Sequence, residues 1–329
     1  MKYSGIGGQA VIEGIMMRNG SKYAVAVRKP DGNIAMDVKE THSWSERHPW
    51  MKWPFIRGTF SFIESMITGI KTLMFSASFY ETEDGEKETP ESGKEAAEDT
   101  EKASGEEGIS KGVLAGTLLV SLAFAIGLFS LLPVLLASIL RKWTDSGFVI
   151  ALAEGVLRIL IFVGYIWAVS MMKDIKRTFM YHGSEHKCIN CIEHGLELNV
   201  ENVRKSSKQH KRCGTSFMLI VMIISVFVFM FIRVDNVLLR MLTRVLLIPV
   251  VAGLSFEFLR FAGTHDGPMI NALSRPGLWL QNLTTREPED DMIEVAITAV
   301  EAVFDWREFQ EKNCGELDRP CDGCPDLTL

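Results

Sequence analysis

The chain has 329 residues, of which 47% are hydrophobic and 23% are charged, and its formal net charge is −6 at pH 7. The length would allow two soluble domains, but long uncharged runs indicate an integral membrane protein instead. The acidic balance comes from residues 81–107, which hold twelve acidic residues and three lysines, so the rest of the chain carries +3. Charge therefore predicts no partner for the folded part, nucleic acid included.

Residues 1–54 are predicted to form a small β-rich cytoplasmic module. Apolar and polar residues alternate along residues 23–27 and 34–38, and residues 30–33 between them are typical of a turn. Three glycines among the first eight residues favour a tight turn that enters a strand. A phosphate-binding loop is the weaker alternative, because no lysine-serine pair or complete dinucleotide motif follows them.

The next segment is predicted to lie at the membrane surface. Trp44, Trp50 and Trp53 are typical of aromatic anchors at the headgroup level, and a metal role for the two nearby histidines is the alternative. Residues 55–80 have the pattern of an amphipathic interfacial helix. Residues 81–110 are too polar to bury a core, so they are predicted to be an acidic disordered linker.

Four transmembrane helices are predicted within residues 111–262, and the first begins too late in the chain for a removable signal peptide. The four apolar runs are residues 112–140, 148–172, 213–232 and 237–261. The second run contains Glu154 and Arg158 on one helix face. A paired structural contact inside the bundle explains them, and the lining of a polar cavity, as in a small-solute carrier, is the alternative. No evident inverted repeat supports a carrier.

The loop between the second and third spans indicates the orientation. Residues 173–212 contain nine Lys or Arg residues, which predicts that this loop is cytoplasmic. With four spans, both termini are then cytoplasmic, and the predicted localisation is the cell membrane. Every cysteine lies on the reducing side, where thiols more often bind metals or do chemistry than form disulfides.

Residues 263–329 are predicted to be a cytoplasmic segment that contains one amphipathic helix. Thr285 is expected to cap this helix, which would begin at Pro288 and dock on the N-terminal module. The tail also holds Cys314, Cys321 and Cys324. Three thiols supply too few ligands for a closed zinc site, so a metal site and a loose end with reactive thiols both remain open.

Seven of the thirteen His and Cys residues lie within residues 182–213. His182, Glu185 and His186 form an H-x-x-E-H sequence, which on a helix places both imidazoles on one face beside the carboxylate. This is the spacing of the inverzincins, in which the glutamate deprotonates a metal-bound water. His210 and Cys213 complete a candidate set of four ligands, and imidazole and thiolate donors together indicate Zn²⁺.

Two arrangements of this site remain open. Closure by His182, His186, His210 and Cys213 would make a structural zinc site that joins the second and third spans. Leaving one ligand out would make room for water, with Glu185 as general base. Cys188 and Cys191 also form a C-x-x-C pair, for which a redox role is the weaker alternative.

Four stretches carry a family resemblance, namely GGQAVIEGIMMR, YHGSEHK, HKRCGTSF and LTTREP. Together they resemble the YqhQ-like family of bacterial membrane proteins, over nearly the whole chain outside the acidic linker and the cysteine tail. The resemblance implies a polytopic inner-membrane protein and a predicted metal-dependent enzyme. It emphasises His182, Glu185, His186, His210 and Cys213. Outside the family pattern lie Cys188, Cys191, His194, His265 and the tail cysteines.

The sequence therefore predicts a mainly α fold: a four-helix transmembrane bundle with a small β-rich N-terminal cytoplasmic module and a C-terminal amphipathic helix. The expected function is metal-dependent hydrolysis at the membrane surface, with the lipid bilayer and a membrane-associated protein or peptide as partners. The alternative is a non-catalytic scaffold or regulator with structural zinc, binding a partner such as the machinery for membrane protein biogenesis. No oligomeric state is predicted.

Overall fold

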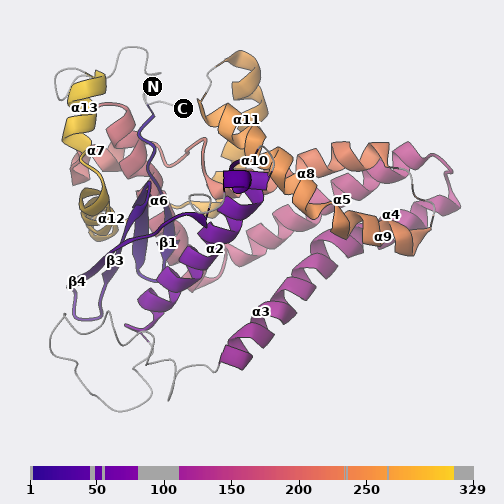
Figure 1. Ribbon diagram of the computed structural model, residues 1–329, viewed down its shortest axis with the longest axis horizontal. Coiled ribbons are helices and arrows are strands. Elements are labelled where there is room, and N and C mark those ends of the chain that lie inside the picture. The colour runs from indigo at the N-terminus through magenta and orange to yellow at the C-terminus, as the bar shows by residue number, and fades with distance from the viewer. Residues whose placement is uncertain are drawn as a thin grey trace. The chain divides into compact units, whose positions relative to one another are not determined.

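The computed structural model describes residues 3–44, 49–53, 56–80, 111–232, 234, 236–264 and 267–314. The chain divides into two compact units. The first consists of Met1–Glu81, Val163–Ser225 and Pro249–Leu329, and the second of Thr82–Phe162 and Val226–Ile248. The described residues are mainly helical, with one sheet near the N-terminus (Figure 1). The predicted linker at residues 81–110, His48, His265, Cys321 and Cys324 lie outside the described residues.

Four antiparallel strands in chain order confirm the predicted N-terminal β structure. They are β1 (Gly7–Val11), β2 (Gly14–Asn19), β3 (Lys22–Arg28) and β4 (Ile34–Glu40). The tight turns between them need backbone in the left-handed region, which Gly20 and Gly32 adopt with φ of 59° and 85°. Glu13, with φ of 48°, does the same in the turn between β1 and β2.

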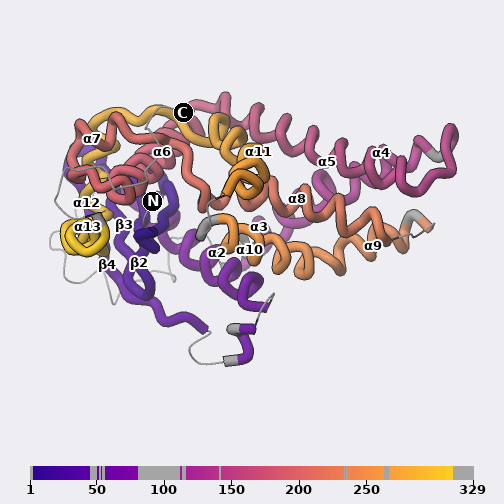
Figure 2. The backbone as a smooth tube through the Cα atoms, turned by 90° about the horizontal axis from the view of Figure 1, so that it is seen from above, coloured from indigo at the N-terminus to yellow at the C-terminus, as the bar shows by residue number. Residues whose placement is uncertain are grey.

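The two faces of the sheet bury different neighbours. The helices concerned are α2 (Ile56–Ala77), α6 (Lys173–Glu193) and α12 (Asp290–Val303). Ile15 and Met17 belong to the core shared with α6 and α12, whereas Met16 and Val25 face the other way, against Phe75 of α2. This is the alternation that a strand imposes on successive side chains. Both views show α12 beside the sheet (Figure 1, Figure 2).

Helix α2 buries small side chains and exposes large ones. Its buried residues are Gly58, Thr68, Gly69, Thr72 and Ser76. Its exposed apolar residues include Phe62, Ile63, Met66, Ile67, Leu73 and Met74. A helix that packs on a soluble core would show the opposite distribution. This helix is not among those apolar enough to be candidate spans, and its interfacial location remains a prediction.

Residues 173–212 are mostly ordered structure rather than an open loop. Helix α6 continues to Glu193, and the short helix α7 (Val200–Lys205) follows it. Twelve residues of α6 are buried, eleven of them in the unbroken stretch from Gly183 onwards. The helix therefore runs through the interior of its unit, with the H-x-x-E-H sequence in its buried half.

The C-terminal segment forms three helices: α11 (Pro268–Thr284), α12 and α13 (Trp306–Cys314). The expectation that Thr285 caps the amphipathic helix is wrong. Thr285 instead ends α11, because its hydroxyl donates to the Gln281 carbonyl one turn earlier, at 2.7 Å. Helix α12 begins at Asp290, with Glu289 as its N-cap.

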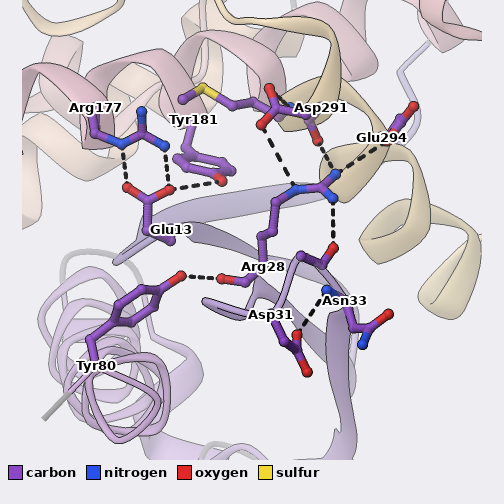
Figure 3. A network of polar contacts seen from close by, with 11 residues as sticks. Glu13, Arg28, Asp31, Asn33, Tyr80, Arg177, Tyr181, Asp291 and Glu294 are labelled. Carbon is purple, nitrogen blue, oxygen red and sulfur yellow. Dashed lines mark hydrogen bonds and ion pairs between the residues drawn. The ribbon is translucent and has the colours of Figure 1, made fainter. Parts of the chain in front are cut away.

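A polar network ties the sheet to α6 and α12 (Figure 3). The Glu13 carboxylate accepts hydrogen bonds from Arg177 and, at 3.3 Å, from the Tyr181 hydroxyl. Arg28 of β3 donates to the Asp291 carbonyl at 2.8 Å and pairs with Glu294 at 3.2 Å. The turn after β1 and the end of β3 are thereby held to the two helices on this face of the sheet.

Within the part of the chain that the structure describes, three helices are long and apolar enough to cross a membrane, consistent with a multi-pass membrane protein. They are Gly116–Ser138, which combines parts of α3 (Lys111–Ile126), a π-helical turn (Gly127–Leu131) and α4 (Leu132–Ser138), then α5 (Gly147–Val169) and α8 (Gly214–Phe231). The predicted fourth span is broken into α9 (Val237–Leu246) and α10 (Ile248–Thr264), which meet at an angle of 42°. Pro249 lies at the start of α10 and cannot donate a helical hydrogen bond there.

Glu154 and Arg158 form a buried pair in the second unit. The guanidinium of Arg158 lies 3.1 Å from the Glu154 carboxylate. Arg244, which sequence reasoning did not connect with them, donates to the same carboxylate at 2.8 and 3.1 Å. Arg158 also donates to the Phe129 carbonyl, which lies in the π-helical turn. These contacts favour the structural pairing, because an unpaired buried charge would be strongly destabilising.

Candidate metal centre

Three of the four predicted ligands come together beside α6. Because His182 and His186 are one helical turn apart, their rings meet edge to face, with centroids 4.4 Å apart. Cys213 lies immediately before α8, and the loop after α7 brings it to the two rings. One ligand atom from each residue lies within 4.8 Å of the others, which is close enough for one ion to contact all three.

Both imidazoles are oriented by main-chain carbonyls. His182 Nδ1 lies 2.8 Å from the Thr284 oxygen, and His186 Nδ1 lies 2.6 Å from the Lys208 oxygen. A carbonyl oxygen only accepts hydrogen bonds, so each Nδ1 carries the proton. The Nε2 atoms are then the ones that can bind a metal. Histidine ligands of metals usually donate a hydrogen bond from their other ring nitrogen, as both histidines do here.

Cys213 is held as a thiolate. Burial would raise the pKa of its thiol, but the positive charges of His182 and His186 hold that pKa well below its ordinary value. Burial in turn lowers the pKa of His182, yet the Cys213 thiolate raises it to about 9. Cys213 Sγ lies 3.2 Å from His182 Nε2 and 3.1 Å from the Thr215 hydroxyl. A divalent ion would take the place of the proton shared by this pair.

Glu185 lies beside the three donors, on the side of β1. Burial raises the pKa of its carboxyl group, and the charges of His182 and His186 act in the opposite direction. Its Oε2 atom is buried without a hydrogen-bond partner among the residues described. A buried carboxylate oxygen without a partner is destabilising unless a water or an ion reaches it. The donor set and this oxygen together fit a metal site that includes water.

Gly8 of β1 makes the approach to Glu185 possible. Its backbone amide lies close enough to the carboxylate to lower the Glu185 pKa. A Cβ atom at Gly8 would lie 2.6 Å from the Met16 oxygen and 3.0 Å from the Glu185 carboxyl carbon. Packing against Met16 and the candidate site is therefore sufficient to require glycine at position 8.

His210, the fourth predicted ligand, does not belong to the group of three. Its ring lies 5.7 Å from that of His186, and its Nε2 atom is 3.8 Å from Glu193. Burial would raise the pKa of Glu193, but His210 and Arg212 lower it to about 2. Burial lowers the pKa of His210 to about 4, so the ring is neutral. Its main chain is held by the buried Gln281 amide, with bonds of 2.8 and 2.7 Å.

The loop that carries His210 and Cys213 is attached to α6 through its carbonyl oxygens. Lys187 Nζ donates to the oxygens of Arg204 and Ser206 at 2.9 and 2.8 Å. Asn190 donates to those of Ser207 and Gln209 at 2.6 and 2.9 Å. Sequence reasoning did not identify Lys187, Asn190, Gln281 or Thr284. Lys187 and Asn190 could have been identified only by their polarity within a buried helical stretch, because buried polar groups need hydrogen-bond partners.

The remaining cysteines and the remaining histidine of α6 and its C-terminal end have structural contacts. Cys188 and Cys191 are buried in the hydrophobic cluster beneath the sheet. Burial raises the pKa of Cys188 well above its ordinary value and that of Cys191 to about 12, so both remain thiols. His194 Nδ1 lies 2.7 Å from the Asn190 oxygen, at the end of α6. None of these three joins the donor group found among the described residues.

Comparison with known proteins identifies relatives of this chain. Residues 53–306 match the family model described as "Protein of unknown function (DUF1385)". The chain is also 38% identical over 308 residues to "Uncharacterized protein YqhQ" from Bacillus subtilis (strain 168), covering 93% of this chain and 94% of the relative. No solved structure matches it significantly.

Proposed function

The chain belongs to the DUF1385 family, whose description names no activity, and from its site we propose that it is a metal-dependent hydrolase at the membrane surface. The observation that carries the proposal is the meeting of His182, His186 and Cys213 beside the buried carboxylate of Glu185. Imidazole and thiolate donors favour zinc. Three protein ligands leave a coordination position open, which is the arrangement of catalytic rather than structural zinc sites.

The chain's own groups support a hydrolytic step. A zinc ion held by these three residues would supply Lewis-acid activation. Glu185 would accept a proton from a water molecule, whose oxygen forms a bond to the carbonyl carbon of an ester or amide. The bond from that carbon to the leaving oxygen or nitrogen then breaks, and Glu185 returns the proton to the leaving atom. Burial raises the pKa of the Glu185 carboxyl group. A raised pKa suits a group that must both accept and return a proton.

The location supports a substrate associated with the membrane. Cys213 directly precedes α8, one of the candidate spans, so the site lies at the end of that span. The basic residues of the segment 173–212 support a cytoplasmic position. We therefore place the site at the cytoplasmic surface of the cell membrane, with both termini on the same side.

Metal analysis and matched variants test the proposal. The purified, detergent-solubilised protein is expected to contain about one zinc per chain, by the one-site reasoning above. His182→Ala should lose the metal, while Glu185→Gln should keep it and lose activity by about 10²- to 10⁴-fold, the contribution of a general base. His194→Ala, a histidine on the same helix outside the donor group, is the control and should keep the metal. Cells in which Glu185→Gln behaves as wild type while His182→Ala fails would exclude hydrolysis.

A second candidate function is a non-catalytic scaffold with structural zinc. It is favoured by the way the donors connect α6, the start of α8 and, through the bond from His182 to Thr284, the end of α11. In this case His210 would turn from Glu193 to become the fourth ligand. His210→Ala separates the two functions: zinc content falls if the site is structural and stays at one per chain if it is catalytic.

A further inference from the structure

We propose that the protein binds its substrate as an extended peptide segment with apolar side chains, paired with the free edge of β1 in the cleft between β1 and α2. This inference rests on the proposed function and names the substrate class of that site. It combines three observations: the outward backbone groups of β1, the apolar cleft beside them and the position of Glu185 at the start of the strand.

The register of the sheet leaves backbone groups of β1 directed outward. Val11 and Gly14 close the two-residue turn, so Val11, Gln9 and Gly7 form the hydrogen-bonded pairs with β2. Gly8 and Ala10 then direct their N–H and C=O groups away from the sheet. The first of these N–H groups approaches Glu185, and that of Ile12, next in the same alternation, donates to the Ser76 hydroxyl at 3.2 Å.

Ala10 lies between these two anchored positions. Its pair with Ile15 is one without ladder hydrogen bonds, and outside the sheet no partner for its N–H or C=O group is found among the residues that the structure describes. The edge of β1 therefore offers the Gly8 carbonyl together with the N–H and C=O groups of Ala10. An added strand uses such groups in peptide recognition by β-augmentation.

An apolar cleft lies beside this edge. It has a volume of about 340 Å³ and is lined by Gln9, Phe62, Ser65, Met66, Ile70 and Leu73, among others. Gly69 allows the Gln9 side chain to pack against α2, since a Cβ atom at position 69 would lie 2.4 Å from the amide oxygen of Gln9. An extended chain whose alternate side chains are apolar would match this surface: its backbone pairs with β1 and its side chains enter the cleft.

The strand that borders the cleft also contacts the candidate metal centre, on its other face. Gly8 belongs to the same strand as Gln9, and its backbone lies against the Glu185 carboxylate. Gly7 and Gly8 are exposed, and nothing lies within 4 Å of a Cβ position at Gly7, so a chain can continue past them. A peptide on β1 would thus pass the general base.

The other end of the cleft lies at the boundary of a span. The ring of Phe62, which lines the cleft, lies 6.1 Å from that of Phe217, in the first turn of α8. Peptide at this place is both accessible from water and close to lipid. We therefore infer an apolar segment that lies next to the membrane. The step is hydrolysis of its peptide bond: the water oxygen bonds to the carbonyl carbon, the C–N bond breaks and Glu185 transfers the proton to the amine nitrogen.

Peptide binding to protein stripped of metal tests the cleft without requiring turnover. The probe is a fluorescein-labelled nonapeptide of alternating leucine and serine, followed by fluorescence anisotropy. Ala10→Pro removes the outward N–H group, and proline is tolerated on an edge strand where that group faces away from the sheet. We expect about three- to tenfold weaker binding, as for the loss of one backbone hydrogen bond.

A second pair of variants tests the cleft through side chains, without the backbone change that Ala10→Pro introduces. Ser65→Arg places a charge in the cleft and should weaken binding at least about tenfold, because the charge would be buried beneath the peptide. Ile67→Arg is the matched control: Ile67 is exposed on the same helix outside the cleft, and its variant should bind the peptide as wild type does.

The outcomes distinguish failure of the peptide-binding proposal from failure of the proposed hydrolase function. Equal binding by wild type, Ala10→Pro and Ser65→Arg overturns the cleft, whether or not the protein hydrolyses anything. The same holds if a labelled fatty acid competes with the peptide at the cleft and binds more tightly, since an acyl chain needs no strand edge. Weakened binding in both variants supports the cleft. If the wild-type enzyme then leaves the bound peptide intact with zinc present, the proposed function fails and the binding site stands.

Discussion

Single glycines decide how closely the chain approaches the candidate ligands. Gly8 admits the Glu185 carboxylate against β1, as described above. Gly183, between His182 and Glu185, performs a similar role for the segment after α11. The Arg286 amide donates to the Phe179 oxygen at 2.9 Å, and the chain crosses α6 at Gly183. This crossing positions the Thr284 carbonyl that accepts the hydrogen bond from His182 Nδ1.

Replacing Gly183 by alanine should disturb this crossing. The added Cβ atom would lie 2.0 Å from the Arg286 carbonyl oxygen, which is main chain and cannot rotate away. Overpacking of this kind lowers the free energy of unfolding by about 1–3 kcal/mol. We expect Gly183→Ala to lower the thermal unfolding midpoint in detergent and to weaken zinc binding.

Gly164→Ala is the control for this variant. Gly164 is also helical, in α5, but nothing lies within 4 Å of its Cβ position. Alanine is favoured over glycine in a helix by about 0.5–1 kcal/mol, so this variant should be at least as stable as wild type. Equal midpoints for the two variants would contradict the account of the crossing.

At the scale of elements, α6 and the loop after α7 each position a different part of the candidate site. The helix places His182, Glu185 and His186 by its own geometry. The loop must be held in place for Cys213 to reach them and for the Lys208 oxygen to orient His186. Lys187 provides much of this support, since its buried ammonium group also pairs with Glu287 at 3.0 Å.

Lys187→Met should therefore loosen the loop without touching a ligand. The oxygens of Arg204 and Ser206 would lose their donor, and the orientation of the His186 ring would become less defined. Loss of a contact that orients a ligand typically lowers metal affinity by about 10- to 100-fold. Competition with a zinc-binding dye measures this change.

Lys205→Met gives the matched comparison. Lys205 forms an exposed ion pair with Glu201 one turn away, and such pairs contribute little. Its zinc affinity should equal that of wild type. An unchanged affinity in Lys187→Met would show that the loop is held by other contacts.

At the scale of the whole molecule, the candidate spans determine which side of the membrane the site occupies. The segment that carries the site lies between α5 and α8, and residues 139–146 connect α5 to the preceding candidate span. The two segments must lie on opposite sides if α5 crosses the bilayer. The excess of lysine and arginine in the segment that carries the site is the basis for proposing that it faces the cytoplasm.

Cysteine labelling tests this topology. In a background without the tail cysteines, Lys205→Cys should react with a membrane-impermeant maleimide in inverted vesicles and not in right-side-out vesicles. Ser146→Cys should show the reverse, because both positions are exposed and the candidate span α5 separates them along the chain. Labelling of both variants from the same side would refute the proposed orientation.

The sequence by itself determined the features that depend on local spacing. Alternation in the first 40 residues and turn-forming glycines indicated the sheet, and long apolar runs indicated the spans, because each of these patterns is complete within one segment. The spacing of His182 and His186 predicted two ligands on one helix face for the same reason. The fourth span was a partial success: its apolar run indicated one span and Pro249 favoured a kink in it, whereas the 42° angle between α9 and α10 is seen only in the structure.

Only the tertiary structure decided which donors meet. Nothing local in the sequence indicates that His182 would be oriented by Thr284, 102 residues away, that Gly8 would lie against Glu185, or that His210 would face Glu193. Such contacts depend on how the sheet, α6 and α11 pack, and packing joins residues whose separation along the chain carries no periodic signal. The donor types were therefore readable from the sequence, whereas the fold decided which of these donors lie close together.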